Sequence, residues 1–225
     1  MNENINPCAQ NCLRRLMRVW FGFERQLNRV DIIYRLENNR FSMEDYRNLL
    51  LHLRQQVIEG SRWITRSASS FTREYAELRS IIIGHAKDEH RDYELLEKDY
   101  VACGGNLNDI QNGERNAGSE ALHGFLMYRA SRENPLDIIG AMWMIEGLGQ
   151  TMALSWADQI DKLTSGGRYT RFLRYHGEND ENHMIRFYQM LDQICTDESI
   201  ARSIEKTATV VGRLYCLQLE EIDET

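Results

Sequence analysis

Apolar residues recur every three or four positions along most of the chain, which is the spacing of one face of an α-helix. This spacing predicts helices over residues 8–37, 42–67, 72–102, 119–131, 134–163, 169–195 and 196–220. Residues that commonly end helices separate these segments, among them Asn38-Asn39 and Gly104-Gly105. No segment has the alternation of a half-buried strand, and no repeat or linker divides the chain. The pattern therefore predicts an all-α protein with one domain over residues 1–225, of which 1–7 are flexible.

Three of these helices begin with a recognisable capping signal. Ser42 is followed three residues later by Asp45, an arrangement that resembles a capping box. Asn134 stands before Pro135, which predicts a cap followed by proline at the first helical position. Thr196 is the predicted cap of the last helix.

The composition narrows the function classes. The chain has 27 Lys and Arg against 34 Asp and Glu, so its net charge of −7 argues against a nucleic-acid-binding surface. It has two prolines in 225 residues, as expected for long uninterrupted helices. Its five cysteines are odd in number and form no CxxC pair, which favours reduced thiols in the cytosol over a zinc site.

The sequence also argues against export and against a membrane span. Residues 1–10 are polar and lack the basic-then-apolar order of a signal peptide. The most apolar stretch, residues 136–157, contains Asp137, Glu146 and Gln150, which are costly in a bilayer. We therefore expect a soluble cytoplasmic protein that binds neither nucleic acid nor membranes.

Glu146 is the informative exception within that apolar stretch. Residues 138–157 are apolar almost all round the helix, which predicts a central helix covered by others on every side. A lone carboxylate in that setting costs several kcal/mol unless it is paired, protonated or bound to a metal. On Glu146 alone, an arginine partner and a metal ion both remain open.

Two further clusters have the side chains that bind metals. Each places three donors at positions i, i+4 and i+7, which share one face of a helix, while His90 points away from the first of these faces. The first cluster is His85, Glu89 and Asp92, and the second is His176, Asp180 and His183. With Glu146 they make seven candidate ligands from three helices. This mixture of carboxylate and imidazole suits iron or manganese better than zinc, and two metals bridged by carboxylates inside a helical bundle are a known arrangement.

At this point the residues resemble a family. Residues 85–105 contain the pattern H-x3-E-x2-(H or D), then L-L-x2-D and a double Gly, and residues 176–183 contain H-x3-D-x2-H. These patterns, with Glu146 between them, are similar to haem-oxygenase-like proteins of the thiaminase-II and pyrroloquinoline-quinone-synthase type, and to the di-iron oxidases of that group. The resemblance covers roughly residues 45–195.

The resemblance implies a fold and an activity. The fold is a single bundle of about seven helices, and homodimers are common in the group. The cofactor is a non-haem di-iron centre, or one with manganese, which activates O2 against a small organic substrate such as an amino or fatty acid derivative. Glu146 falls where the di-iron oxidases have a bridging Glu. Asp92 stands where many members have a His, which puts the strength of one of the two metal sites in question. Some members use a Glu from the preceding helix, for which Glu59 is the candidate here, with His52 on the same face.

Three alternatives remain open. A ferritin-like di-iron bundle would use Glu89, Glu120, His123, Glu146, Asp180 and His183. A metal-free member of the same fold, a thiaminase-type hydrolase or a cofactor-free oxidase, would rely on a nucleophilic Cys or on His and Tyr; neither Cys103 nor Cys195 has an evident base beside it. A non-catalytic helical interaction domain would pair Glu146 with an Arg. Haem is disfavoured because no isolated His on the first helix offers an axial ligand.

Residues near the predicted site have both a core and a pocket interpretation. Four large side chains would fill or line the space near Glu146, namely Met142, Trp143, Met144 and Trp156. Three tyrosines are candidates for orienting the ligands, namely Tyr93, Tyr128 and Tyr175.

Overall fold

The computed structural model describes residues 6–163 and 169–223, and of residues 179–184 it describes the backbone. Its helices are α1 (Pro7–Leu27), α2 (Asp31–Glu37), α3 (Met43–Val57), α4 (Gly60–Ser70), α5 (Ala76–Glu89), α6 (Tyr93–Ala102), α7 (Leu107–Gln111), α8 (Ala117–Ala130), α9 (Ile138–Leu163), α10 (Arg171–Ile194) and α11 (Glu198–Glu220), with 3₁₀ turns at Arg73–Tyr75 and Glu221–Asp223. Within these ranges there is no β-strand, so the all-α prediction is confirmed. Among the described helices, no segment combines the length and the hydrophobicity of a membrane span.

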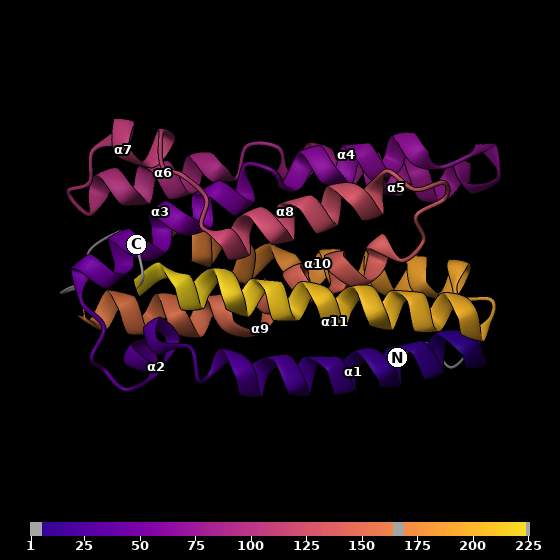
Figure 1. The fold of residues 1–225 in the computed structure, drawn as a ribbon, viewed down its shortest axis with the longest axis horizontal. Helices are drawn as coiled ribbons and strands as arrows, with labels where there is room; N and C mark the ends of the chain where they lie inside the picture. The colour runs from indigo at the N-terminus through magenta and orange to yellow at the C-terminus, as the bar shows by residue number, and fades with distance from the viewer. Residues whose placement is uncertain (1–5, 164–168, 224–225) are drawn as a thin grey trace.

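The helices form an elongated bundle with α9, α10 and α11 through its middle (Figure 1). In Figure 1, α1 and α2 lie along one side, and α3 to α7 lie along the opposite side. α9 packs against α10, α11, α8 and α2, and α1 packs along α11. Most of α9 is buried, including every residue from Ile138 to Met144. The position of α9 confirms the central helix predicted from its apolar residues.

Three of the predicted long helices are each divided in two. The breaks fall between Leu27 and Asp31, between Val57 and Gly60, and between Glu89 and Tyr93. The apolar spacing continues across each break because both halves bury a face, but the halves pack on different neighbours. α3 lies on α6, for example, whereas α4 lies on α5 and α8. The segment between the helices predicted over 72–102 and 119–131 also contains the short helix α7.

The capping signals differ in outcome. The capping box is confirmed, since the Ser42 hydroxyl accepts from the Asp45 N–H at 3.1 Å and the Asp45 carboxylate accepts from the Ser42 N–H at 2.7 Å. The Asn134 cap is wrong: Asn134 has a φ of 47° and α9 begins at Ile138. Its side-chain oxygen instead accepts from the Thr72 N–H at 2.8 Å. The cap of α11 is the residue after Thr196, where the Asp197 carboxylate accepts from two N–H groups.

Two glycines allow α11 to lie directly against its neighbours. A Cβ added to Gly140 of α9 would overlap the backbone oxygen of Ile204, and one added to Gly118 of α8 would overlap the backbone of Gln218. In both places the nearest atoms belong to the backbone of α11, which cannot rotate away as a side chain can. α8 and α9 are therefore held at a backbone-to-backbone distance from α11 that only glycine permits.

Asp99 of α6 caps the first turn of α10, where the residue before the helix, Thr170, makes no capping bond. Its carboxylate accepts hydrogen bonds from the Phe172 N–H and from the Arg171 guanidinium, both at 3.0 Å. The Asp99 side chain is completely buried. This burial raises the pKa of Asp99 from 3.8 to about 6, against the lowering effect of its two donors.

Raising the pH is expected to lower the stability of the wild type relative to an Asp99→Asn variant. Between about pH 4 and pH 6, folded Asp99 holds a proton that the unfolded chain has released, so each rise in pH favours the unfolded state. At about 1.4 kcal/mol per unit of pKa difference, the loss amounts to roughly 2–3 kcal/mol by neutral pH. Urea denaturation of both proteins across this interval measures the difference, and parallel curves would contradict the role of burial.

Candidate metal centre

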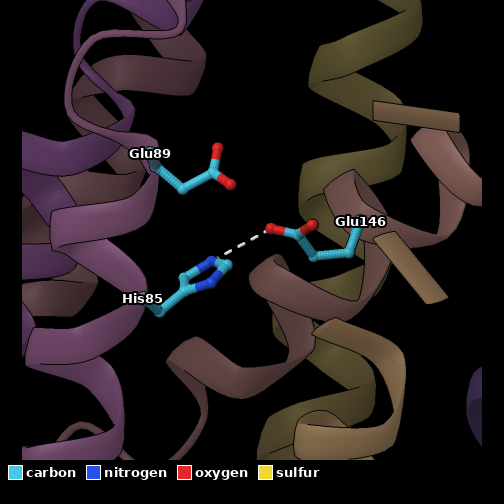
Figure 2. Close-up of side chains that lie close together, drawn as sticks. All are labelled: His85, Glu89 and Glu146. Atoms are coloured by element: carbon cyan, nitrogen blue, oxygen red, sulfur yellow. Dashed lines mark ion pairs between the residues drawn. The ribbon is translucent and has the colours of Figure 1, made fainter. Parts of the chain in front are cut away.

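Three helices bring predicted ligands to one place inside the bundle. Glu146 lies in the first half of α9 and points toward α5, where its Oε1 is 3.0 Å from Nε2 of His85 (Figure 2). Glu89 lies one turn beyond His85 on α5 and points into the same space (Figure 2). Each of these three side chains offers one ligand atom, and the three atoms lie within 4.8 Å of one another.

A second group of donors adjoins the first. It consists of Glu89, Asp92 and His176, whose ligand atoms also lie within 4.8 Å of one another. Nε2 of His176 on α10 is 3.4 Å from Oδ2 of Asp92. Glu89 belongs to both groups, so the two are joined through one carboxylate. We name the five side chains of the two groups the donor cluster; they are His85, Glu89, Asp92, Glu146 and His176.

The backbone that positions the first three predicted ligands differs from the single helix expected from the sequence. His85 and Glu89 share a face of α5, as their spacing predicts, but α5 ends at Glu89. Asp92 stands just before α6, at the bend between the two helices. The bend leaves Asp92 next to Glu89, so the cluster forms although the single helix predicted over 85–92 is wrong. The two remaining predicted ligands, Asp180 and His183, follow His176 on α10, and their side chains lie outside the described residues.

The donor cluster is shielded from solvent. His85, Asp92, Glu146 and His176 are each at least nine-tenths buried, and Glu89 is half-buried. Carboxylates so placed are costly unless an opposite charge compensates them. In the part of the chain that the structure describes, the Glu146 carboxylate lies against the imidazole of His85. Three carboxylates and two imidazoles are the donor set that iron and manganese prefer, so the residues fit such a metal.

A cavity of about 90 Å³ lies beside the donor cluster. Glu89, Glu146 and His176 form part of its wall. The rest is mostly apolar and includes Leu53, Val57, Trp63, Ile64, Met142, Leu148, Trp156, Phe172 and Leu173. No Lys or Arg is among the lining residues that the structure describes. This volume holds several water-sized groups, which suits a small molecule or a part of one.

Two polar side chains of the cavity wall were not expected from the sequence. Gln56 of α3 accepts a hydrogen bond from the Gln218 amide at 3.0 Å, so its own amide protons remain for other acceptors. Tyr215 of α11 is 8% exposed, and burial raises the pKa of its hydroxyl. Both residues lie on apolar helix faces, where helical spacing alone does not distinguish a pocket residue from a core residue.

The large apolar residues near Glu146 divide between cavity and core. Met142 and Trp156 line the cavity. Trp143 instead packs its ring against Trp20 and Phe187, at centroid distances of 5.9 and 6.2 Å.

The three candidate tyrosines also differ in their surroundings. Tyr175 packs edge-on against His176 at 5.4 Å, whereas Tyr93 lies under Arg54 and Tyr128 is exposed. Phe172, which the sequence did not single out, packs on His176 at 4.4 Å.

The other candidate ligands have different surroundings. The Glu59 carboxylate binds Arg62 at 2.8 Å and also pairs with Arg115, and it lies 3.7 Å from His123. Glu120 is largely exposed and contacts Arg115 at 3.4 Å. In the part of the chain that the structure describes, none of these side chains, nor His52, joins the donor cluster. The arrangement needed for a ferritin-like site is therefore not formed by Glu120 and His123, and His90 is exposed as expected.

Comparisons with known proteins identify a family and a fold. The family described as iron-containing redox enzymes matches residues 72–214, a segment that includes all seven predicted ligands. A domain of unknown function with a haem oxygenase-like fold from Shewanella denitrificans has a TM-score of 0.86 at 14% identity, over 92% of this chain and 90% of that one. A TenA homologue from P. horikoshii has a TM-score of 0.74 at 14% identity, over 96% and 97% of the two chains. Another from Pseudomonas syringae pv. tomato has 0.75 at 12% identity, over 99% of each chain. No curated protein is similar enough in sequence to match.

Proposed function

The chain belongs to the family of iron-containing redox enzymes and has the haem-oxygenase-like fold, and from this premise we propose that it is a non-haem di-iron oxidase or oxygenase. Its substrates would be O2 and a small organic molecule. The observation that carries the proposal is the donor cluster, in which two groups of three ligands share Glu89. A carboxylate shared between two adjacent groups is what a pair of metal ions requires.

Each residue of the cluster has a role under this proposal. His85, Glu89 and Glu146 would hold one ion, and Glu89, Asp92 and His176 the other. The carboxylate common to both groups is thus Glu89, whereas the resemblance implies that role for Glu146. Asp180 and His183 are further proposed ligands from the same helix as His176. Iron bound there, or iron with manganese, would supply the activation of O2. The three carboxylates would offset most of the charge of two divalent cations. The packing of Phe172 and Tyr175 on His176 fixes the orientation of that imidazole.

The cavity supports a small, largely apolar substrate. Its aromatic and aliphatic walls exclude water from the side of the donor cluster that Glu89, Glu146 and His176 form. Since the described lining has no cationic side chain, the apolar part of the substrate is the part expected to enter. The Gln56 amide and the Tyr215 hydroxyl are the groups available to hold a polar substituent in place. An amino or fatty acid derivative would satisfy these conditions.

A metal-free hydrolase of the thiaminase type is the second candidate. The likeness of the fold to two TenA homologues favours it. Such an enzyme needs a nucleophile beside its substrate, and among the described residues of the cavity wall there is no cysteine. Three carboxylates gathered around two imidazoles are also more acid–base groups than one nucleophilic displacement uses. The di-iron proposal therefore accounts for more of the site.

Anaerobic reconstitution with Fe(II) is expected to give more than one iron per chain, because the cluster has two groups of donors. Admission of O2 should then produce a transient absorption band in the visible range. Iron analysis after desalting and stopped-flow absorption spectroscopy measure the two results. Less than about one metal per chain after reconstitution would overturn the proposal.

The variants Glu120→Ala and His123→Ala are expected to bind as much iron as the wild type, because both side chains lie with Glu59 and Arg115 and not in the donor cluster. Iron content after the same reconstitution tests this. Loss of about half the iron in either variant would instead favour the ferritin-like arrangement of ligands.

A further inference from the structure

Two cysteines from opposite ends of the sequence meet outside the donor cluster. Sγ of Cys8, in the first turn of α1, is 3.6 Å from Sγ of Cys195, which follows the last residue of α10. Cys12 lies one turn further along α1, and its thiol points to the backbone oxygen of Ala201 at 3.8 Å. Cys8 is half-buried, whereas Cys12 and Cys195 are completely buried.

Hydrogen bonds hold the two chain segments in this position. The Asn6 N–H donates to the Asp192 carboxylate at 2.7 Å, and the Asn6 side-chain amide donates to the Asp192 backbone oxygen at 2.6 Å. Asn6 is two residues before Cys8, and Asp192 is three residues before Cys195. The proximity of the two sulfurs therefore results from a fixed contact between the start of α1 and the end of α10.

We propose that Cys8 and Cys195 are an oxidation site at which hydrogen peroxide forms a disulfide that ties α1 to the end of α10. The Cys8 sulfur first attacks one peroxide oxygen, which gives a sulfenic acid and one water. The Cys195 sulfur then attacks the Cys8 sulfur, the sulfur–oxygen bond breaks, and a second water leaves. The two sulfurs together lose two electrons, which the peroxide gains, and the two thiol protons end in the two waters.

The surroundings determine the order of these steps. Burial raises the pKa of Cys12 to about 11 and raises that of Cys195 as well, so both remain thiols. Of these three cysteines, Cys8 alone is partly exposed, so peroxide reaches its sulfur first. Forming the bond requires the sulfurs to approach from 3.6 Å to about 2.05 Å. That movement falls on the terminal turn of a helix, where the chain yields most readily.

Peptide mapping of the full-length protein tests the proposal. The protein is treated with hydrogen peroxide in the presence of a chelator, unfolded, alkylated with N-ethylmaleimide and digested with trypsin. The sequence places Cys8 and Cys12 on one peptide, residues 1–14, and Cys195 on another, residues 187–202. We expect these two peptides to be linked in the wild type and separated again by dithiothreitol.

Serine variants identify the partners. The link should persist in Cys12→Ser and in the control Cys216→Ser, and it should be absent from Cys8→Ser, whose half-exposed position tolerates serine. A link that survives in Cys8→Ser would assign the bond to Cys12 and overturn the proposal. Oxidation of Cys8 to sulfinic acid with Cys195 fully alkylated would overturn it too. The outcome is independent of iron binding, so it leaves the proposed oxidase activity to its own test.

Discussion

Replacing Glu146 by glutamine is expected to weaken iron binding by more than roughly 100-fold, since even residues that only support a ligand contribute 10–100-fold. Glutamine keeps the shape of the side chain but removes the charge that faces His85 and Glu89. Without metal, the variant should be as stable as the wild type or more so, because a buried carboxylate is costly to desolvate. Iron content after reconstitution, chelator competition and urea denaturation of the metal-free protein measure these effects.

Glu59→Gln is the matched control for this variant. Glu59 and Glu146 are both 7% exposed, but Glu59 pairs with Arg62 and Arg115. Its replacement should leave iron binding unchanged and lower the free energy of unfolding by about 1–3 kcal/mol, because the arginines lose their buried partner. If Glu146→Gln lost stability and kept its iron, Glu146 would be a structural residue and the metal proposal would fail.

The second large effect is expected on stability. Gly140→Ala should lower the free energy of unfolding by about 3 kcal/mol or more, because the new methyl group forces the backbones of α9 and α11 apart. Gly118→Ala should behave alike through Gln218 of α11. Urea denaturation of the metal-free variants measures the loss. The higher helix propensity of alanine offsets only about 1 kcal/mol of it.

Two other helical glycines make the comparison specific. Gly22 of α1 and Gly124 of α8 would place a Cβ in open space, with no atom within 4 Å apart from neighbouring residues of the same helix. The same substitution there should stabilise the protein by up to about 1 kcal/mol, because alanine favours the helix. Equal effects at Gly140 and Gly22 would show that the close packing of α9 on α11 does not limit stability.

Much of the fold could be predicted because helical spacing is a local property. The apolar residues located most of the helices, and the nearly continuous apolar run around Glu146 identified α9 as central. The breaks at Leu27–Asp31, Val57–Gly60 and Glu89–Tyr93 could not be predicted in the same way. Each depends on which neighbour the second half of the helix meets, and that is decided by contacts distant in sequence.

The candidate site could likewise be predicted only where it depends on local spacing. Spacing correctly placed His85 and Glu89 on one face, but the approach of α5 to α9 and α10 is a property of the folded bundle. The different surroundings of Met142 and Met144 could have been predicted, since residues two apart on a helix point to nearly opposite sides. Met142 is one turn before Glu146 and shares its cavity, whereas Met144 approaches Gly212 on another face. The place of Gln56 and Tyr215 in the cavity wall could not be predicted, because nothing in the sequence of their helices indicates a cavity.

The composition of the cavity wall has a consequence for substrate choice. All five residues of the donor cluster lie within the segment that matches the redox-enzyme family, residues 72–214. Part of the cavity wall is built by α3 and α4, through Leu53, Gln56 and Trp63, which precede that segment. On the proposed function, the metal ligands and this part of the substrate cavity come from different segments of the chain. Exchange of residues 43–70 between related proteins would then redirect substrate choice and leave the metal-binding portion intact.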